Sequence, residues 1–175
     1  MFQYAQAAPE EDMAIDVHMQ GDMVIVDGIA TVAATSSETW AVLTDYDHMA
    51  EFLPNLESSK KIEDNGNGNG NEFQIAQKGK LRFGPFSLSF SSLRKIILDP
   101  DTKIVSSAIS GNFRKLDSIT QLSGTAGGTR IDYHVEAIPD IALPDVIAVS
   151  MARKSVREFF DGVKAEIERR KSIPQ

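Results

Sequence analysis

A long stretch of alternating residues in the middle of the chain limits the folds that the sequence can adopt. Apolar side chains at Phe73, Ile75, Leu81 and Phe83 alternate with charged or amide side chains. A period of two residues is typical of a strand with one buried and one solvated face, and such strands usually pair in antiparallel sheets. The chain is therefore predicted to form an antiparallel sheet whose apolar face another element must cover.

Further runs of this kind follow, and each is bounded by residues that favour turns. Strands are predicted around Phe86–Phe90, Ile104–Ile109, Leu116–Leu122 and Thr129–Val135. The turns between them fall at Gly84-Pro85, Asp99–Asp101, Gly111-Asn112 and Gly124–Gly128. This spacing indicates one continuous meander.

The segment before the meander predicts a strand pair and then a first short helix. Residues Ile15–Ala34 alternate in broken fashion around a turn at Gly21. Thr35 and Glu38 have the spacing of a capping box, in which each side chain accepts a hydrogen bond from the other residue's backbone. A helix is therefore expected to begin after Thr35 and to end near Asp45.

A second short helix is expected directly afterwards. Asp47 could cap it, Met49, Phe52 and Leu53 fall on one face, and Pro54 closes it. Isolated helices of this length are marginal in water. Both short helices are therefore predicted to cover one end of the curved sheet.

The chain ends in a pattern that predicts one long helix from Pro144 to about Lys171. Its apolar row comprises Val146, Val149, Val156, Phe160, Val163 and Ile167, and Arg153 interrupts this row. Gly162 lies inside the helix, where it either allows another backbone to approach or lets the helix bend. The predicted fold is α+β, with two short helices after the first strand and a curved antiparallel sheet wrapped around the terminal helix.

Length and charge limit the classes of function. The 175 residues fit one domain, assigned to residues 15–175. A net charge of -7 disfavours a nucleic-acid partner, because it repels a phosphate backbone. The absence of cysteine excludes thiolate zinc sites and cysteine nucleophiles.

Residues 1–14 are predicted to form a flexible tail. Ala5-Gln6-Ala7 has the small-x-small pattern of a signal-peptidase site, but no apolar segment precedes it. The tail is either the remnant of an export signal or a simple polar extension. The compartment, cytoplasmic or periplasmic, therefore stays open.

Several weak motifs in a fixed order support a family resemblance. The runs WAVLTDYDHMAEFLPNL, FQIAQKG, GNFRKL, GGTRIDYHVEAIP and ALPDVIAVSMARKSVREFFDGVKAEI lie between Ala30 and Arg170. Together they resemble the polyketide cyclase/dehydrase and lipid-transport family of the SRPBCC or START-like group. The resemblance implies a helix-grip fold with a deep apolar cavity between sheet and terminal helix. It does not imply one chemistry, because the group includes carriers, receptors and some cyclases.

One stretch departs from the pattern of that family. Where relatives often have a tryptophan, in the strand after GNFRKL, this chain has Ser118-Ile119-Thr120. Smaller side chains there would enlarge or reshape the cavity. The ligand of a relative should therefore not be transferred to this chain.

Polar residues on apolar faces are the first candidates for ligand contacts. Gln77 is in phase with the apolar side of its strand, where it binds a ligand or is a buried amide satisfied by backbone. Tyr133 could offer its hydroxyl to the cavity or bond to backbone at the core edge. Arg153 could hold a ligand oxygen, lie along the helix edge, or pair with an acid such as Asp45.

Aromatic residues complete the predicted ligand site. Phe83, Phe90 and Phe113 either fill the core or stack against a ligand. The predicted ligand-binding set is therefore Gln77, Phe83, Phe90, Phe113, Tyr133 and Arg153.

No catalytic, metal or cofactor set is predicted. His18, His48 and His134 lie far apart, and no Gly-x-Ser-x-Gly elbow is present. The NGNGNG run starts like a calcium loop, but Ala76 stands where the bidentate glutamate would be. We interpret this run as a hairpin tip.

Three functions are compatible with these patterns. The leading one is a non-enzymatic binder or carrier of a small hydrophobic ligand, such as a lipid, isoprenoid or polyketide-like aromatic. The second is a polyketide cyclase or aromatase, and the third is an adaptor for a protein partner. Stable membrane insertion is not expected, although the basic face of the terminal helix could contact a membrane transiently. The oligomeric state is left open.

Overall fold

The computed structural model describes residues 12–62 and 70–174, which form one sheet, two short helices and one long helix. The strands are β1 (Met13–Gln20), β2 (Met23–Val32), β3 (Leu56–Ile62), β4 (Glu72–Phe83), β5 (Phe86–Asp99), β6 (Lys103–Gly111), β7 (Phe113–Thr125) and β8 (Gly128–Pro139). The helices are α1 (Ser36–Leu43), α2 (Met49–Phe52) and α3 (Asp145–Lys171). The order of elements confirms the predicted α+β class, and the two short helices follow β2, the second strand, rather than the first.

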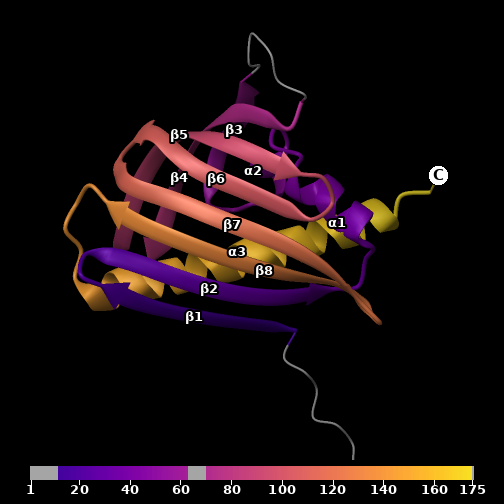
Figure 1. Cartoon of the computed structure of the whole chain (residues 1–175). Helices are drawn as coiled ribbons and strands as arrows, with labels where there is room; N and C mark the ends of the chain where they lie inside the picture. The colour runs from indigo at the N-terminus through magenta and orange to yellow at the C-terminus, as the bar shows by residue number, and fades with distance from the viewer. Residues whose placement is uncertain (1–11, 63–69, 175) are drawn as a thin grey trace, which may run out of the picture.

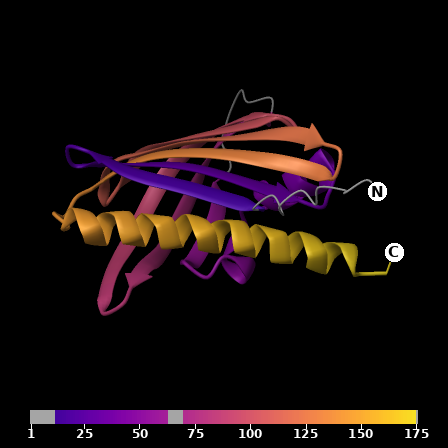
Figure 2. The ribbon, with the colours of Figure 1, turned by 90° about the horizontal axis from the view of Figure 1, so that it is seen from below.

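The sheet curls around α3. Its strand order is β1-β2-β8-β7-β6-β5-β4-β3, and all neighbouring strands are antiparallel. The long helix contacts β1 and β2 at one edge and β4 near the other. Figure 1 shows this arrangement, and Figure 2 shows α3 lying along the concave side of the sheet. The predicted wrapping of the sheet around the terminal helix is confirmed.

Alternation sets the two faces of the sheet. In β4 the side chains of Phe73, Ile75 and Gln77 are buried, and the residues between them are exposed or half-buried. Strand β3 was not predicted, because most of its side chains are exposed and it contains no clear apolar alternation. It pairs with β4 at one edge of the sheet.

The capping box of α1 is confirmed. The Thr35 hydroxyl accepts from Glu38 N at 3.1 Å, and the Glu38 carboxylate accepts from Thr35 N at 2.8 Å. The predicted Asp47 cap of α2 is wrong: His48 occupies that position and makes no side-chain cap. Asp47 instead accepts from the backbone N of Lys61 at 2.8 Å, which ties the segment before α2 to β3.

Helix α3 begins one residue later than predicted, with Pro144 as its N-cap residue. Its buried row includes Val156, Phe160, Val163 and Ile167, as the spacing predicts. Val146 differs, because it is 73% exposed. The first turn therefore contributes no apolar side chain at this position to the core.

Gly162 allows α2 and α3 to approach closely. A Cβ atom at this position would lie 2.6 Å from the carbonyl oxygen of Phe52 and 2.9 Å from Leu53 Cδ2. Of the two interpretations of this glycine, close backbone approach is the one that the structure supports. The glycine sets how near α2 lies to the long helix.

Ion pairs attach the last turns of α3 to the segment between α1 and α2. Glu166 is buried and accepts from both Arg169 and Arg170 at 2.7 Å. Arg170 also donates to Asp45 at 2.5 Å, and Lys171 donates to the carbonyl oxygen of Ala33 at 2.7 Å. Asp45 is therefore an ion-pair partner, as expected, but its partner is Arg170.

Two sequence predictions concern residues outside the described ranges. Ala5-Gln6-Ala7 and most of the NGNGNG run lie there. Strand β1 begins at Met13, so the last residues of the predicted tail, Met13 and Ala14, belong to the sheet.

Candidate functional site

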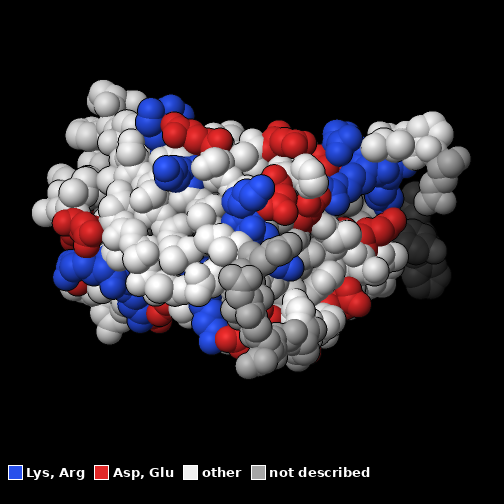
Figure 3. All heavy atoms as spheres, turned by 90° about the horizontal axis from the view of Figure 1, so that it is seen from above, with Lys and Arg blue, Asp and Glu red and all other residues white. Residues whose placement is uncertain are grey.

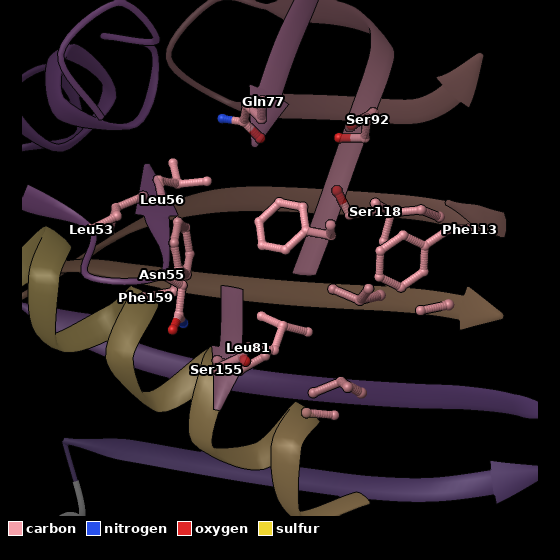
Figure 4. A pocket seen from close by; sticks show the side chains of 18 of the residues that line it. Leu53, Asn55, Leu56, Gln77, Leu81, Ser92, Phe113, Ser118, Ser155 and Phe159 are labelled. Atoms are coloured by element: carbon pink, nitrogen blue, oxygen red, sulfur yellow. The ribbon is translucent and has the colours of Figure 1, made fainter. Parts of the chain in front are cut away.

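A cavity of about 270 Å³ lies between the concave face of the sheet and α3. Leu43, Tyr46, Met49 and Leu53 line the part contributed by α1, α2 and their flanking residues. Figure 4 shows side chains from the strands and from α3, among them Ser155 and Phe159, directed into this space. The two short helices thus bury their apolar side chains by closing the cavity.

The lining is mostly apolar. Aliphatic and aromatic side chains from every layer contribute, including Leu81, Leu88, Leu116, Val135, Met151 and Phe159. Ligand pockets commonly combine such walls with a few polar groups, and typical pocket volumes start at about 300 Å³. The cavity therefore suits a small apolar molecule with few polar atoms.

Four of the predicted site residues line this cavity: Gln77, Phe90, Phe113 and Tyr133. The rings of Phe90 and Phe113 meet edge to face with centroids 6.5 Å apart. The ring of Tyr133 lies 5.0 Å from that of Phe159 on α3. Their contact with a ligand stays a prediction.

Phe83 is placed differently from the expectation. It pairs with Phe86 at the tip of the β4–β5 hairpin, where Gly84 has a φ of 54°. Both rings are exposed, and neither lines the cavity. The alternation that predicts an inward position for Phe83 continues past the region that α3 covers.

Arg153 also lies away from the cavity. Its side chain is exposed, and Nη1 donates to the carbonyl oxygen of Ile15 at 2.7 Å. This bond joins α3 to β1. Arg153, which interrupts the apolar row of the helix, therefore faces the edge of the sheet. The expected alternative of pairing with Asp45 is not observed, because Asp45 pairs with Arg170.

Gln77 is fully engaged with other side chains. Its Nε2 donates to Ser59 Oγ at 3.0 Å and contacts Met49 Sδ at 3.7 Å. Its Oε1 accepts from Arg94 Nη2 at 2.5 Å. The amide is satisfied, as one interpretation held, but by side chains rather than by backbone.

Arg94 also lines the cavity but is not among the residues predicted from the sequence. It lies on β5 and lines the cavity together with Ser92 and Ile96 of the same strand. The period of two that places Leu88 and Phe90 inward continues through these positions. The alternation along the strand therefore already predicts that Arg94 points inward, two residues beyond Ser92.

Arg94 is half-buried, its Nε is enclosed, and its guanidinium has no counterion among the described residues. Among residues 12–62 and 70–174, no carboxylate forms an ion pair with it, and its buried Nε has no hydrogen-bond partner. Burial lowers the pKa of Arg94, while the neighbouring Tyr133 and Tyr46 oppose that change. An unpaired ion that loses part of its solvent on folding destabilises the folded protein. A residue this costly to the free protein is a strong candidate for a ligand contact.

Hydroxyl groups on neighbouring strands add further polar atoms to the lining. Ser106, Ser118 and Thr120 lie on the inner face of adjacent strands, and the buried Ser106 Oγ has no partner among the described residues. Ser118 and Thr120 occupy the stretch that departs from the family pattern. Burial raises the pKa of Tyr133, and the charge of Arg94 opposes this rise, so the phenol is a neutral hydrogen-bonding group.

The histidines take part in separate surface pairs. His134 Nδ1 lies 2.7 Å from Asp27, His48 Nδ1 lies 2.6 Å from Asp45, and His18 is near Asp16. No group of three or more potential metal ligands occurs within the described ranges.

Charges of both signs are mixed on the face shown in Figure 3. Basic and acidic groups lie next to one another on this face, and a broad area toward the left of the view carries no charged group. None of the described helices is both long enough and apolar enough to cross a membrane.

Sequence comparison identifies a family. The profile described as polyketide cyclase/dehydrase and lipid transport matches residues 32–164. That match includes the short helices, the whole meander and most of α3. No curated protein has a matching sequence.

Solved structures share the fold at low sequence identity. A STAR-related lipid transfer protein from Xanthomonas axonopodis has a TM-score of 0.73 at 12% identity, covering 93% of this chain and 97% of its own. A START superfamily protein from Mycobacterium smegmatis has a TM-score of 0.71 at 11% identity, with coverages of 83% and 97%. The Zhui aromatase/cyclase from a Streptomyces species has a TM-score of 0.69 at 18% identity, with coverages of 85% and 95%. The START-like, helix-grip architecture is thus confirmed.

Proposed function

The chain belongs to the polyketide cyclase/dehydrase and lipid-transport family, and we propose that it binds and carries a small hydrophobic molecule in the cavity between the sheet and α3. Lipids, isoprenoids and polyketide-like aromatics are the candidate ligands. The name of the Xanthomonas neighbour, a lipid transfer protein, agrees with this role.

The cavity itself is the observation that carries the proposal. Its volume of about 270 Å³ lies between two layers of the fold, and its walls are mostly apolar. An unfilled apolar space costs a protein stability, since its lining loses packing contacts. A ligand that fills the space restores those contacts. The adaptor hypothesis predicts a filled core, so the cavity argues against it.

Purification without detergent is expected to yield protein that carries an apolar molecule. Native mass spectrometry of the protein, with an organic extract analysed beside it, identifies the mass and chemical class of that molecule. After removal of the bound molecule, a panel of apolar compounds should bind more tightly than about 1 mM, which corresponds to about 4 kcal/mol. Failure of every compound to reach that affinity would contradict the proposal.

A cavity-filling variant sharpens this test. Ala152 on α3 lines the cavity, and Ala165 on the same helix is exposed. Ala152→Phe should weaken binding by about tenfold or more, because the added ring occupies the ligand's space. Ala165→Phe should bind as the parent protein does. Equal loss in both variants would indicate a general effect on the helix.

An aromatase or cyclase role is the second candidate, and one observation favours it. Arg94 and Tyr133 both line the cavity, and their donors could polarise carbonyl oxygens of a folded chain, whereas the amide of Gln77 is already bonded to Ser59 and Arg94. Arg153 has no part in this set, because it lies outside the cavity. The Streptomyces neighbour is an aromatase/cyclase by name.

This second role makes its own prediction. With a poly-β-ketone substrate, Tyr133→Phe should lower turnover by about 100-fold, the usual effect of removing one such donor. The melting temperature should stay close to that of the parent protein, because the ring still packs against Phe159. Absence of turnover in the parent protein would leave the carrier role as the function.

A further inference from the structure

The lining of the cavity includes the charged side chain of Arg94. Within the described part of the chain, Arg94 is the only charged residue in that lining, which contains no Asp or Glu. Among the residues that the structure describes, its guanidinium donates one hydrogen bond, to the amide oxygen of Gln77, and this acceptor is neutral. The positive charge is therefore placed inside an apolar space without compensation from the described residues.

The surroundings of Arg94 orient the guanidinium without neutralising it. Gln77 bridges Arg94 and Ser59, which fixes one side of the group. Burial raises the pKa of both Tyr46 and Tyr133, so neither phenol supplies a negative charge at neutral pH. Nε is enclosed, so the terminal nitrogens are the donors that a ligand can reach. A donor held in this way is preorganised for an acceptor in the cavity.

We propose that the ligand is an apolar molecule bearing a single carboxylate, and that Arg94 binds this carboxylate inside the cavity. The inference rests on the proposed function, because it requires a ligand in the same space. A guanidinium presents several N–H donors in a planar fork, which matches the two oxygens of a carboxylate. The carboxylate supplies the missing counterion, and the apolar walls receive the hydrocarbon part.

A preference for ligands with a carboxylate would come from Arg94 and not from the net charge of the protein. The chain carries a net charge of -7, so its outer surface does not attract an anion by its total charge. A contact with Arg94 inside the cavity is screened by salt much less than a contact with exposed lysines. Preference for an acid should therefore persist at high ionic strength, whereas a surface effect would disappear.

A matched pair of ligands tests the proposal. Decanoate and decanol have the same chain length and differ in the charged end group. After removal of bound molecules, titration calorimetry at neutral pH should show decanoate binding at least about tenfold more tightly than decanol, the usual effect of a hydrogen bond to a charged group. The preference should remain at about 1 M salt, where exposed charges are screened.

Variants assign the preference to one side chain. Arg94→Met removes the charge at similar length and should abolish the preference while decanol still binds. Arg94→Lys should keep part of it, because the charge remains but the fork is lost. Arg153→Met is the matched control, because Arg153 is exposed and bonded to Ile15 outside the cavity. Thermal unfolding of each variant verifies that it is folded.

The outcomes separate this inference from the proposed function. Equal affinity of the parent protein for decanoate and decanol would overturn the inference and leave an apolar carrier in place. A preference that survives in Arg94→Met, or that is lost in Arg153→Met, would also overturn it. Binding of neither compound, nor of any other apolar probe, would contradict both. Because the parent protein alone gives the first comparison, a variant that fails to fold does not prevent the test.

Discussion

Replacing Gly79 by alanine is expected to lower the free energy of unfolding by about 3 kcal/mol, because the added carbon has no room. A Cβ atom there would lie 1.9 Å from the carbonyl oxygen of Asn55 and 2.9 Å from the ring of Phe90. Lys80 N donates to the same carbonyl at 2.9 Å, so relief of the clash breaks this bond. Asn55 and Phe90 also line the cavity, and ligand binding should weaken together with stability.

Urea unfolding followed by circular dichroism measures this effect. Gly124 provides the control, since it also lies in a strand and an added Cβ would meet no atom within 4 Å. Gly124→Ala should change the free energy of unfolding by less than about 1 kcal/mol. If Gly79→Ala were as stable as this control, the segment around Asn55 would have to shift without cost.

The second large effect is expected at Glu166. Hydrogen bonds from Arg169 lower the pKa of this carboxyl to about 2, against the opposing effect of burial, and Arg170 adds to the shift. Because the Arg169 side chain is 60% exposed, solvent weakens the pair. Glu166→Gln should therefore lower the free energy of unfolding by about 2 kcal/mol at neutral pH.

The pH dependence of this loss has a definite sign. A carboxyl whose pKa is lower in the folded state stabilises the fold above its unfolded pKa, and the contribution disappears on acidification. The difference between the parent protein and Glu166→Gln should be full above pH 4.5 and shrink as the pH falls toward about 2. Denaturant unfolding at several pH values measures it, with the exposed Glu168→Gln as control. A difference that does not change with pH would contradict the ion-pair origin.

Local sequence patterns predicted the elements that have one apolar and one polar face or a clear capping signal. The alternation of β4 and the capping box of α1 depend on residues within a few positions, so the sequence displays them directly. Strand β3 has neither feature, because it is an edge strand with mostly exposed side chains. The role of Asp47 was also hidden, since its partner, Lys61, comes from β3.

In the candidate site, too, local patterns revealed some residues, while the placement of others depends on distant parts of the chain. Gln77 and Tyr133 were found because a polar group on an apolar face is visible in the alternation. Arg94 satisfies the same rule, but the predicted strand ended at Phe90, before the rule could apply. Arg153 was misplaced because the helical period shows that a position departs from the apolar row, but not which edge of the sheet it meets. That information requires the topology of the sheet.

The attachment of α3 at its last turns has a consequence for how a ligand enters and leaves. Glu166, Arg170 and Lys171 hold that end against the segments around α1, and Gly162 packs it onto α2. Because the last turns of α3 are held in place, we expect the first turns, near the exposed Val146, to move most when the cavity opens. Motions of this kind take microseconds to milliseconds. The bond from Arg153 to Ile15 joins this moving half of α3 to β1. We therefore expect its loss to raise the rate of ligand exchange and to leave the affinity unchanged.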